Sequence, residues 1–229
     1  MLDNISIIIP LGPGEDQHHG LLDDLRALCA AGPEIIPVAC DGSSGRGAIS
    51  SLPGRALQQN CGAAVARRDF LWFLHADSTV TDEVVRALAA SVKEAPDSLH
   101  YFHLKFAGDG AGWLRLNEWG ARFRSDILGL PFGDQGFCLS RENFNRIGGF
   151  PEQAAYGEDH LLVWHARQAG IALRPTGVAL TTSARKYRTH GWGRLTVKYQ
   201  LLWIRQAWPE FLRLFRRLFW RLIGRSKRP

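Results

Sequence analysis

The sequence has few cysteines, no long hydrophobic run and no basic leader, and each absence excludes a class of protein. Its 4 Cys lie far apart without a C-x-x-C pair, which excludes a disulfide scaffold or zinc ribbon and predicts reduced thiols. No apolar run approaches the roughly 18 residues of a membrane-spanning helix. The first residues, Met-Leu-Asp-Asn, lack the basic stretch of a signal peptide, so we expect a cytoplasmic protein.

Glycine and proline are too few for a repetitive chain. The sequence holds 24 Gly and 11 Pro among 229 residues, and 45% of its residues are hydrophobic. These values exclude a collagen-like chain and wholesale disorder. The length suits one sizeable hydrophobic core with an appendage.

Acidic residues are nearly absent from the C-terminal fifth of the chain. Residues 184–229 contain 13 Lys and Arg but one acid, Glu210, whereas residues 1–183 contain 15 bases and 21 acids. The net charge of +6 therefore combines an acidic body with a strongly basic tail. Such a tail indicates an anionic partner, which could be a phospholipid, a nucleic acid or a phosphorylated ligand.

Short apolar runs alternate with helix-like stretches along the body. We expect strands at 6–10, 34–39, 70–74 and 101–106, and helices near 18–31, 56–67, 82–95 and 160–169. This alternation predicts an α/β domain with a mostly parallel central sheet flanked by helices. We place this domain at residues 1–190 and a basic amphipathic helical tail at residues 191–229.

Carboxylates follow two of the expected strands, at the edge where parallel sheets bind ligands. Asp41 begins an Asp-Gly-Ser sequence, which is also a favoured turn. Asp77 follows the apolar strand Phe70–Leu74, where it suits a divalent cation that also holds a diphosphate, or merely begins a turn. The sequence has no G-x-G-x-x-G and no P-loop motif, which disfavours nicotinamide and P-loop sites.

Other polar residues are candidates for ligand contacts. Arg55 begins a helix and can meet a phosphate there, and Gln59 and Asn60 can orient a ligand, unless all three form a solvated helix start. Asp134 and Gln135 lie in a Gly-Asp-Gln loop that can bind an acceptor hydroxyl.

Eight motifs together resemble one family in their order and spacing. They are the strand ending at Pro10, Asp41-Gly-Ser, Gly-Arg-x-x-Gln-x-Asn, His-Ala-Asp-Ser, Gly-Asp-Gln, Gly-Gly-Phe-Pro, Glu-Asp and Thr182-Ser-Ala-Arg185. Over roughly residues 5–195 the chain resembles a family 2 glycosyltransferase with the GT-A fold. Within that family it is most similar to the small bacterial branch associated with arsenosugar-type biosynthesis.

The resemblance implies a role for each matching residue. Pro10 would lie in the donor site, and Asp41 would contact the nucleotide base. Asp77 matches the last acid of a D-x-D-like motif, which binds the Mn²⁺ or Mg²⁺ that bridges the donor diphosphate. Asp159 matches the general base of inverting transferases, and Arg185 falls where a basic motif closes the site over the diphosphate.

The chain also departs from the family pattern. His75 stands where the first acid of D-x-D is usual, and Leu-Gly-Pro-Gly-Glu15 follows Pro10 in place of Pro-x-x-Asn-Glu. His190 is either a late metal ligand or a surface histidine. Glu158 is assigned to the acceptor site, although two acids at a helix start can also act as simple caps.

The expected function is therefore metal-dependent transfer of a hexosyl group, with inversion, from a nucleotide-diphosphate sugar, foremost a UDP-sugar, to an acceptor hydroxyl. A sugar-phosphate nucleotidyltransferase is the first alternative, but its first loop is usually basic, whereas Leu11–Gln17 carries no base. A non-catalytic membrane- or nucleotide-binding module is the second alternative. No RNA-recognition or helix-turn-helix signature is present, so no nucleic acid partner is expected.

The tail combines an apolar helical face with a basic one. Apolar residues recur at three-four spacing, at Leu201, Ile204, Trp208, Phe211, Leu212, Phe215, Leu218, Phe219 and Leu222. Arginines largely take the other side, at positions 205, 213, 216, 217 and 221. We expect Pro209 to divide the tail into two helices. The pattern favours peripheral binding to the inner face of a membrane that carries a lipid-linked acceptor; packing on the body or on a second copy, as a homodimer, is the alternative.

Overall fold

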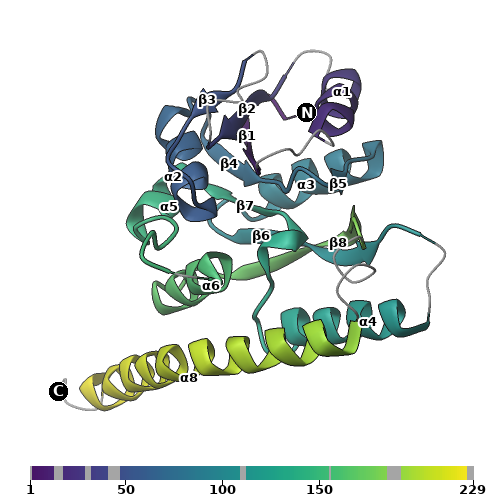
Figure 1. Ribbon diagram of the computed structural model, residues 1–229. Helices are drawn as coiled ribbons and strands as arrows, with labels where there is room; N and C mark the ends of the chain where they lie inside the picture. The colour runs from purple at the N-terminus through teal and green to yellow at the C-terminus, as the bar shows by residue number, and fades with distance from the viewer. Residues whose placement is uncertain are drawn as a thin grey trace.

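The computed structural model describes residues 2–12, 18–28, 32–40, 47–108, 112–154, 156–184 and 192–225. In this part of the chain eight strands form one sheet in the order β3-β2-β1-β4-β7-β6-β8-β5, with helices on both faces (Figure 1). The strands are β1 Ile5–Leu11, β2 Glu34–Ala39, β3 Ile49–Ser50, β4 Phe70–Phe73, β5 Ser78–Thr79, β6 Leu99–Phe106, β7 Phe137–Ser140 and β8 Leu173–Thr182. The helices are α1 His18–Leu28, α2 Arg55–Val65, α3 Asp82–Glu94, α4 Gly112–Asp126, the short 3₁₀ helix η1 Gly133–Gln135, α5 Arg141–Arg146, α6 Glu158–Gln168 and α8 Trp192–Arg225.

The N-terminal half of the sheet is parallel and fully buried. Strand β1 pairs in parallel with β2 and β4, and every residue of β1 is buried. Because successive side chains of a strand point to opposite faces, Ile7 and Ile9 pack with α1 and α3, whereas Ile8 packs with α2, α5 and α6. This explains why β1 is an unbroken apolar run from Ile7 to Leu11, and it confirms the predicted α/β layers.

Helix α2 approaches the sheet closely at Gly62. A Cβ atom at this position would lie 2.5 Å from Cγ2 of Ile8 and 3.1 Å from Cγ2 of Val38. Only glycine therefore fits between this helix and the strands without a shift of the core. The contact fixes α2, and with it Arg55 at the start of the helix, against the carboxyl ends of β1 and β2.

The C-terminal half of the sheet brings in antiparallel strands. Strand β7 lies antiparallel between β4 and β6, and β8 pairs in parallel with β6 and antiparallel with β5. Four of the seven strand pairings are parallel, so the expectation of a mostly parallel sheet is confirmed. The antiparallel pairings have a functional consequence, because they bring loops that are distant in the sequence to the end of β4.

The predicted division of the tail at Pro209 is wrong, because α8 continues through this residue as one helix. Packing holds the helix on both sides of the proline. Trp203 and Ala207 precede it and Leu214 follows it, and all three pack against the core. Glu210 is buried and accepts hydrogen bonds from Gln168 (2.8 Å) and Arg213 (2.5 Å). Pro209 itself is exposed, so water can satisfy the carbonyl that loses its partner.

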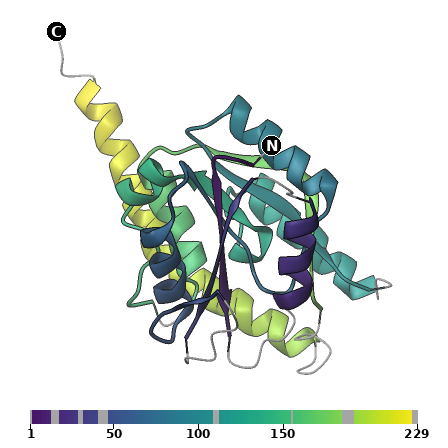
Figure 2. The same ribbon diagram turned by 90° about the horizontal axis from the view of Figure 1, so that it is seen from above.

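The far end of α8 extends beyond the rest of the molecule (Figures 1 and 2). Of the helices in the described residues, none combines the length and the apolar character needed to cross a membrane.

Candidate functional site

Strand pairing brings three separate loops to the carboxyl end of β4. Phe73 of β4 pairs with Phe137 of β7 in antiparallel register, so the segment after β4 lies beside the Gly-Asp-Gln turn that precedes β7. Thr182, at the end of β8, pairs with Ser78, and its hydroxyl donates a hydrogen bond to Asp77 Oδ1 at 3.3 Å. The register of the sheet therefore places Asp77 among residues more than 50 positions away in the sequence.

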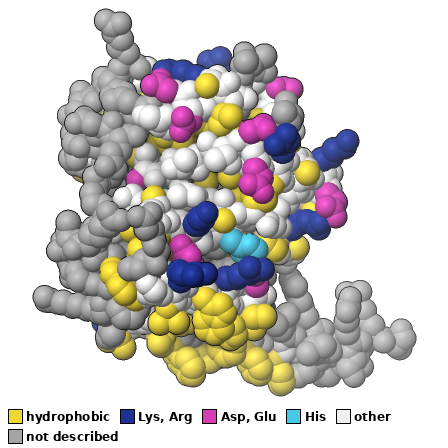
Figure 3. Space-filling view, turned by 90° about the vertical axis from the view of Figure 1, so that its right-hand side faces the viewer, with side chains coloured by type: hydrophobic (Ala, Val, Ile, Leu, Met, Phe, Trp, Pro, Cys, Tyr) yellow, Lys and Arg dark blue, Asp and Glu magenta, His cyan; other side chains and the backbone are white. Residues whose placement is uncertain are grey.

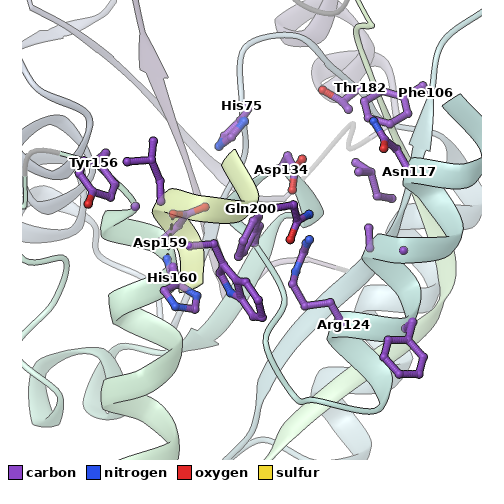
Figure 4. A pocket seen from close by; sticks show the side chains of 18 of the residues that line it. His75, Phe106, Asn117, Arg124, Asp134, Tyr156, Asp159, His160, Thr182 and Gln200 are labelled. Carbon is purple, nitrogen blue, oxygen red and sulfur yellow. Dashed lines mark hydrogen bonds between the residues drawn. The ribbon is translucent and has the colours of Figure 1, made fainter. Parts of the chain in front are cut away.

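A pocket of about 550 Å³ lies where these loops meet, and Figure 4 shows its side chains. The volume falls within the usual range of small-molecule sites. Its polar side is lined by Arg55, His75, Asp77, Asp134, Asp159 and Arg124. Its apolar side is lined by Leu104, Phe106, Leu116, Phe123, Leu128, Phe132, Leu202 and Trp203. Such a division suits a ligand with a charged part and an apolar part.

Asp159 stands at the start of α6 and is held by backbone amides. Its Oδ2 accepts a hydrogen bond from Gly133 N at 2.5 Å, and its Oδ1 accepts one from His160 N at 2.8 Å. A Cβ atom at Gly133 would lie 2.9 Å from Asp159 Oδ2, so the glycine is needed for this approach. Each carboxylate oxygen can accept a second hydrogen bond, and Asp159 lines the pocket where a ligand can supply it.

Asp134 is the most strongly desolvated of the pocket carboxylates. Its Oδ1 is buried and has no hydrogen-bond partner among the described residues. Burial raises the pKa of Asp134 to about 6, against the opposing charge of Arg124, while the charges of Asp159 and Asp77 raise it further. An acceptor oxygen left without a partner in a pocket is costly, so a hydrogen-bond donor of a ligand at this oxygen would lower the cost.

Gln135, predicted to bind an acceptor, is engaged within the protein. It is fully buried, its Oε1 accepts hydrogen bonds from Ser125 Oγ (2.9 Å) and Phe132 N (3.0 Å), and its Nε2 donates to Phe102 O (2.8 Å). These bonds connect the turn before β7 to α4 and β6. Gln135 therefore positions the neighbouring Asp134, and it does not line the pocket itself.

The three predicted residues of α2 have different surroundings. Arg55 is exposed at the pocket, and its Nη1 lies 3.3 Å from His75 Nε2. Gln59 is buried, and its Oε1 has no hydrogen-bond partner among the described residues. Asn60 donates to Phe150 O and accepts from Phe150 N, each at 2.9 Å. Asn60 thus holds the Gly-Gly-Phe-Pro turn, and of the three residues Arg55 alone lines the pocket.

Two further predicted residues do not line the pocket. Pro10 is buried in β1 and pairs with Val38. Glu158 is half-buried before Asp159, and burial together with the charge of Asp159 raises its pKa. Asp41, Arg185 and His190, as well as Glu15, lie outside the described residues.

The pocket contains a cation that the sequence interpretation missed. Arg124 of α4 lines the pocket, and its guanidinium carbon lies 3.6 Å from the centroid of the Phe132 ring. Its Nε donates a hydrogen bond to Leu130 O at 2.9 Å. Stacking and hydrogen bonding hold the positive charge at the pocket wall. The spacing of Trp113, Leu116 and Phe123, which are three and then seven residues apart, was the available signal for this helix.

His160 and Trp203 present hydrogen-bond donors at the wall of the pocket. Trp164 Nε1 donates to His160 Nε2 at 2.8 Å, which leaves the ring proton on Nδ1. Burial lowers the pKa of His160 to about 4, so the ring is neutral at pH 7. His160 Nδ1 and Trp203 Nε1 are both buried without a hydrogen-bond partner among the described residues, and both side chains line the pocket.

The carboxylates fit a divalent cation only if a ligand completes its coordination. In the part of the chain that the structure describes, no group of three or more His, Cys, Asp or Glu side chains could hold a metal ion. Mg²⁺-type sites commonly use one or two protein carboxylates with oxygens of a substrate phosphate. Asp77, which has one oxygen bonded to Thr182, and Asp134, with its unsatisfied Oδ1, supply oxygen donors of this kind.

Comparison with solved structures identifies the fold. A mannosyltransferase, PcManGT from Pyrobaculum calidifontis in complex with GDP-Man and Mn²⁺, matches with a TM-score of 0.68 over 96% of this chain and 70% of that one, at 13% sequence identity. Residues 1–349 of TarS from S. aureus match with a TM-score of 0.61 over 79% of this chain, at 16% identity. The chain has the GT-A glycosyltransferase fold. The catalytic domain of Drosophila β1,4-galactosyltransferase 7, in complex with xylobiose, matches with a TM-score of 0.51 over 76% of this chain and 65% of that one, at 15% identity.

These similarities concern the fold alone. The chain spans 60% of the TarS 1–349 structure that it matches. No protein-family model matches the sequence, and no curated protein matches it. The relation to one glycosyltransferase branch therefore stays a prediction from the motifs.

Proposed function

We propose that the protein transfers a sugar from a nucleotide-diphosphate donor to an acceptor hydroxyl, with inversion at the anomeric carbon. One observation carries this proposal: Asp77, Asp134 and Asp159, from three separate segments of the chain, line one pocket together with Arg55 and Arg124 in a GT-A fold. Carboxylates can hold a metal and accept a proton, and cations can neutralise a departing diphosphate. All three tasks serve metal-dependent, inverting transfer from a nucleotide sugar.

The donor diphosphate would bind between Asp77 and Arg55. Asp77 would hold a Mn²⁺ or Mg²⁺ ion, which supplies Lewis-acid stabilisation of the diphosphate when bound. Arg55 begins α2, where its guanidinium and the helix N-terminus both present positive charge to an anion. We retain Asp41 as a contact to the base, Arg185 as a residue that closes over the diphosphate, and His190 as a metal ligand.

The acceptor would bind between Asp159 and Asp134. Asp159 accepts the proton of the acceptor hydroxyl as the oxygen attacks the anomeric carbon. The bond between that carbon and the diphosphate oxygen breaks on the opposite side, and the nucleoside diphosphate leaves with the bonding electron pair. The amides of Gly133 and His160 fix the orientation of the Asp159 carboxylate. The unsatisfied Oδ1 of Asp134 can accept a hydrogen bond from a second hydroxyl of the acceptor.

The nucleotide is proposed as UDP, in keeping with the motif resemblance. Solved structures with this fold include PcManGT with GDP-Man and TarS 1–349 with UDP-GlcNAc, so the panel that tests the donor must include both bases.

The experiment measures release of nucleoside diphosphate from a panel of UDP-, GDP-, dTDP- and ADP-sugars with and without Mn²⁺, using water as a surrogate acceptor. We expect at least one sugar nucleotide to be cleaved in a metal-dependent manner. Asp77→Asn should remove the metal dependence and most of the rate. Asp23→Asn is the matched control, because its side chain is 77% exposed on α1. Cleavage by Asp77→Asn with unchanged metal dependence would contradict the assignment of Asp77.

A further inference from the structure

The apolar face of α8 that the sequence pattern predicts points outward in the structure. Its side chains are among the most exposed large hydrophobic residues: Leu201, Ile204, Trp208, Phe211, Leu212, Phe215 and Phe219. A different side of the helix, with Trp203, Ala207 and Leu214, packs against the core. Helix α8 is thus attached to the body along one side while its main apolar face is exposed to solvent.

Helix α4 exposes a second apolar face on the same side of the sheet (Figure 1). Its exposed side chains are Trp113, Leu116, Trp119 and Phe123, and Ile127 directly follows the helix and is counted with them; Trp119 and Ile127 are 66% and 69% exposed. Leu114, Ala121 and Ser125 fix the other side of this helix in the protein. Figure 3 shows hydrophobic side chains gathered along the lower edge of the molecule. We name the exposed apolar residues of α4 and α8 the apolar platform.

Aromatic stacking orders the platform within each helix. The rings of Trp119 and Phe123 are stacked with centroids 6.0 Å apart. On α8, Trp208 stacks with Phe211 (6.4 Å), and Phe215 stacks with Phe219 (6.3 Å). A contiguous exposed surface of this kind is unusual for a soluble monomer and marks an interaction site.

The charges beside the platform are positive. Exposed arginines flank it at positions 115, 122, 205, 213, 216 and 217; Arg122 pairs with Asp126 and Arg213 with Glu210, and the other four make no ion pair among the described residues. The acids of the two helices are engaged within the protein: Glu210 accepts from Gln168, Glu118 accepts from Phe106 N at 2.7 Å, and Asp126 accepts from Tyr101 at 3.0 Å. Symmetric pairing of two copies through this surface would bring arginines against arginines without facing acids. An anionic lipid surface complements both the apolar face and its basic surroundings.

The platform is continuous with the wall of the pocket. Leu116, Phe123 and Leu128 are exposed to solvent and also line the pocket, together with Leu202 and Trp203 of α8. The same pocket is lined on its polar side by Asp134 and Asp159. An amphiphile that lies with its chain along this wall would present a polar head to the two carboxylates.

We propose that the apolar platform of α4 and α8 docks on an anionic membrane, and that the acceptor is an amphiphile whose hydroxyl reaches Asp159 from this side. The second part rests on the proposed glycosyl transfer, whereas docking does not. Exposed tryptophans suit the headgroup region, and each arginine near an anionic surface contributes enough to change partitioning about five-fold.

Docking is tested by co-sedimentation of the full chain with vesicles of phosphatidylcholine alone and of phosphatidylcholine mixed with phosphatidylglycerol, over a salt series. We expect binding to the anionic vesicles that weakens with salt. The double variant Trp119→Ala/Trp208→Ala should lose most of it, and Arg205→Gln/Arg216→Gln should lower partitioning about twenty-fold or more. Leu52→Ala and Arg86→Gln are matched controls, because Leu52 is 70% exposed and Arg86 is 64% exposed at sites outside the platform.

Two results would overturn docking. One is equal binding of the platform variants and the controls. The other is a wild-type protein that binds no vesicles and sediments as a dimer, while the Trp119→Ala/Trp208→Ala variant sediments as a monomer. That result would make the platform an interface between copies.

The acceptor is tested by nucleoside diphosphate release with octyl glucoside, below its micelle concentration, against methyl glucoside at equal concentration. We expect the octyl compound to change the rate and the methyl compound to have little effect. An equal response to both compounds, or to neither, would overturn the amphiphilic acceptor. A wild-type protein that cleaves no nucleotide sugar would instead refute the proposed function, and the vesicle experiment would still decide docking.

Discussion

Replacing Asp134 with asparagine tests the electrostatics of the pocket directly. Burial raises the pKa of Asp134 to about 6, compared with about 3.9 for an unperturbed aspartate. A carboxyl group whose pKa is higher in the folded than in the unfolded protein favours folding while it is protonated. Its contribution to the free energy of unfolding is complete below the pKa of the unfolded state, and it is lost as the pH rises through the pKa of the folded state. A shift of about two units corresponds to about 3 kcal/mol. Between pH 4 and pH 7, the free energy of unfolding of the wild type should therefore fall by about 2 to 3 kcal/mol relative to that of Asp134→Asn.

The assay is urea unfolding of wild type and Asp134→Asn at several pH values over this range, with Asp23→Asn as the exposed control. The difference in unfolding free energy should change mainly between pH 4 and 6, in the direction that favours the variant, and become constant near pH 7. The control should show no such dependence. A difference that does not vary with pH, or a wild type that gains relative stability as the pH rises, would refute the reasoning.

Three further predictions concern turnover and packing. Asp159→Asn should lower kcat about 10²- to 10⁴-fold with nucleotide affinity retained, because it removes a general base; wild-type turnover would contradict this role. Gln58→Ala should destabilise the fold by about 2 kcal/mol in urea unfolding, because the buried Gln58 Nε2 donates to the carbonyls that end β1 and β2 (2.7 and 2.8 Å). Gly62→Ala should cost about 1 to 3 kcal/mol by overpacking, whereas Gly120→Ala, with open space around its Cβ, should stabilise α4 slightly; equal effects would contradict the packing argument.

The sequence predicted the N-terminal half of the fold because burial and periodicity agree there. The strand ending at Pro10 is apolar on both faces, since it lies between two helical layers, and the helix over Asp82–Glu94 begins at Thr81, whose hydroxyl accepts from Val84 N. The placement of Asp77 at a strand end followed from the same pattern.

The elements that were missed have patterns that follow other rules. Helix α4 turns Trp119 and Phe123 outward, so its apolar residues do not indicate the core. Strand β8 is only partly buried over most of its length, which weakens an apolar signal. The convergence of Asp134 on Asp77 depends on antiparallel pairing between β4 and β7, a long-range contact that neither segment encodes by itself.

Helix α8 shows which part of a helical arrangement a periodic pattern can predict. The apolar face at three-four spacing is present, yet the residues that attach the helix to the body, Trp203 and Glu210 among them, belong to another side. A helical pattern identifies which residues share a face. It does not identify which face packs on the protein, because that depends on the surface that the body offers.

We propose that the pocket beside Asp77 binds a nucleotide-diphosphate sugar with a divalent cation. This can be measured by isothermal titration of the full chain with UDP, GDP, dTDP and ADP, with Mn²⁺ and again with EDTA. We expect at least one nucleoside diphosphate to bind in the presence of Mn²⁺, and we expect EDTA and Asp77→Asn each to weaken this binding at least ten-fold. Absence of binding by every nucleoside diphosphate in the presence of Mn²⁺, or equal binding to wild type and Asp77→Asn, would contradict it.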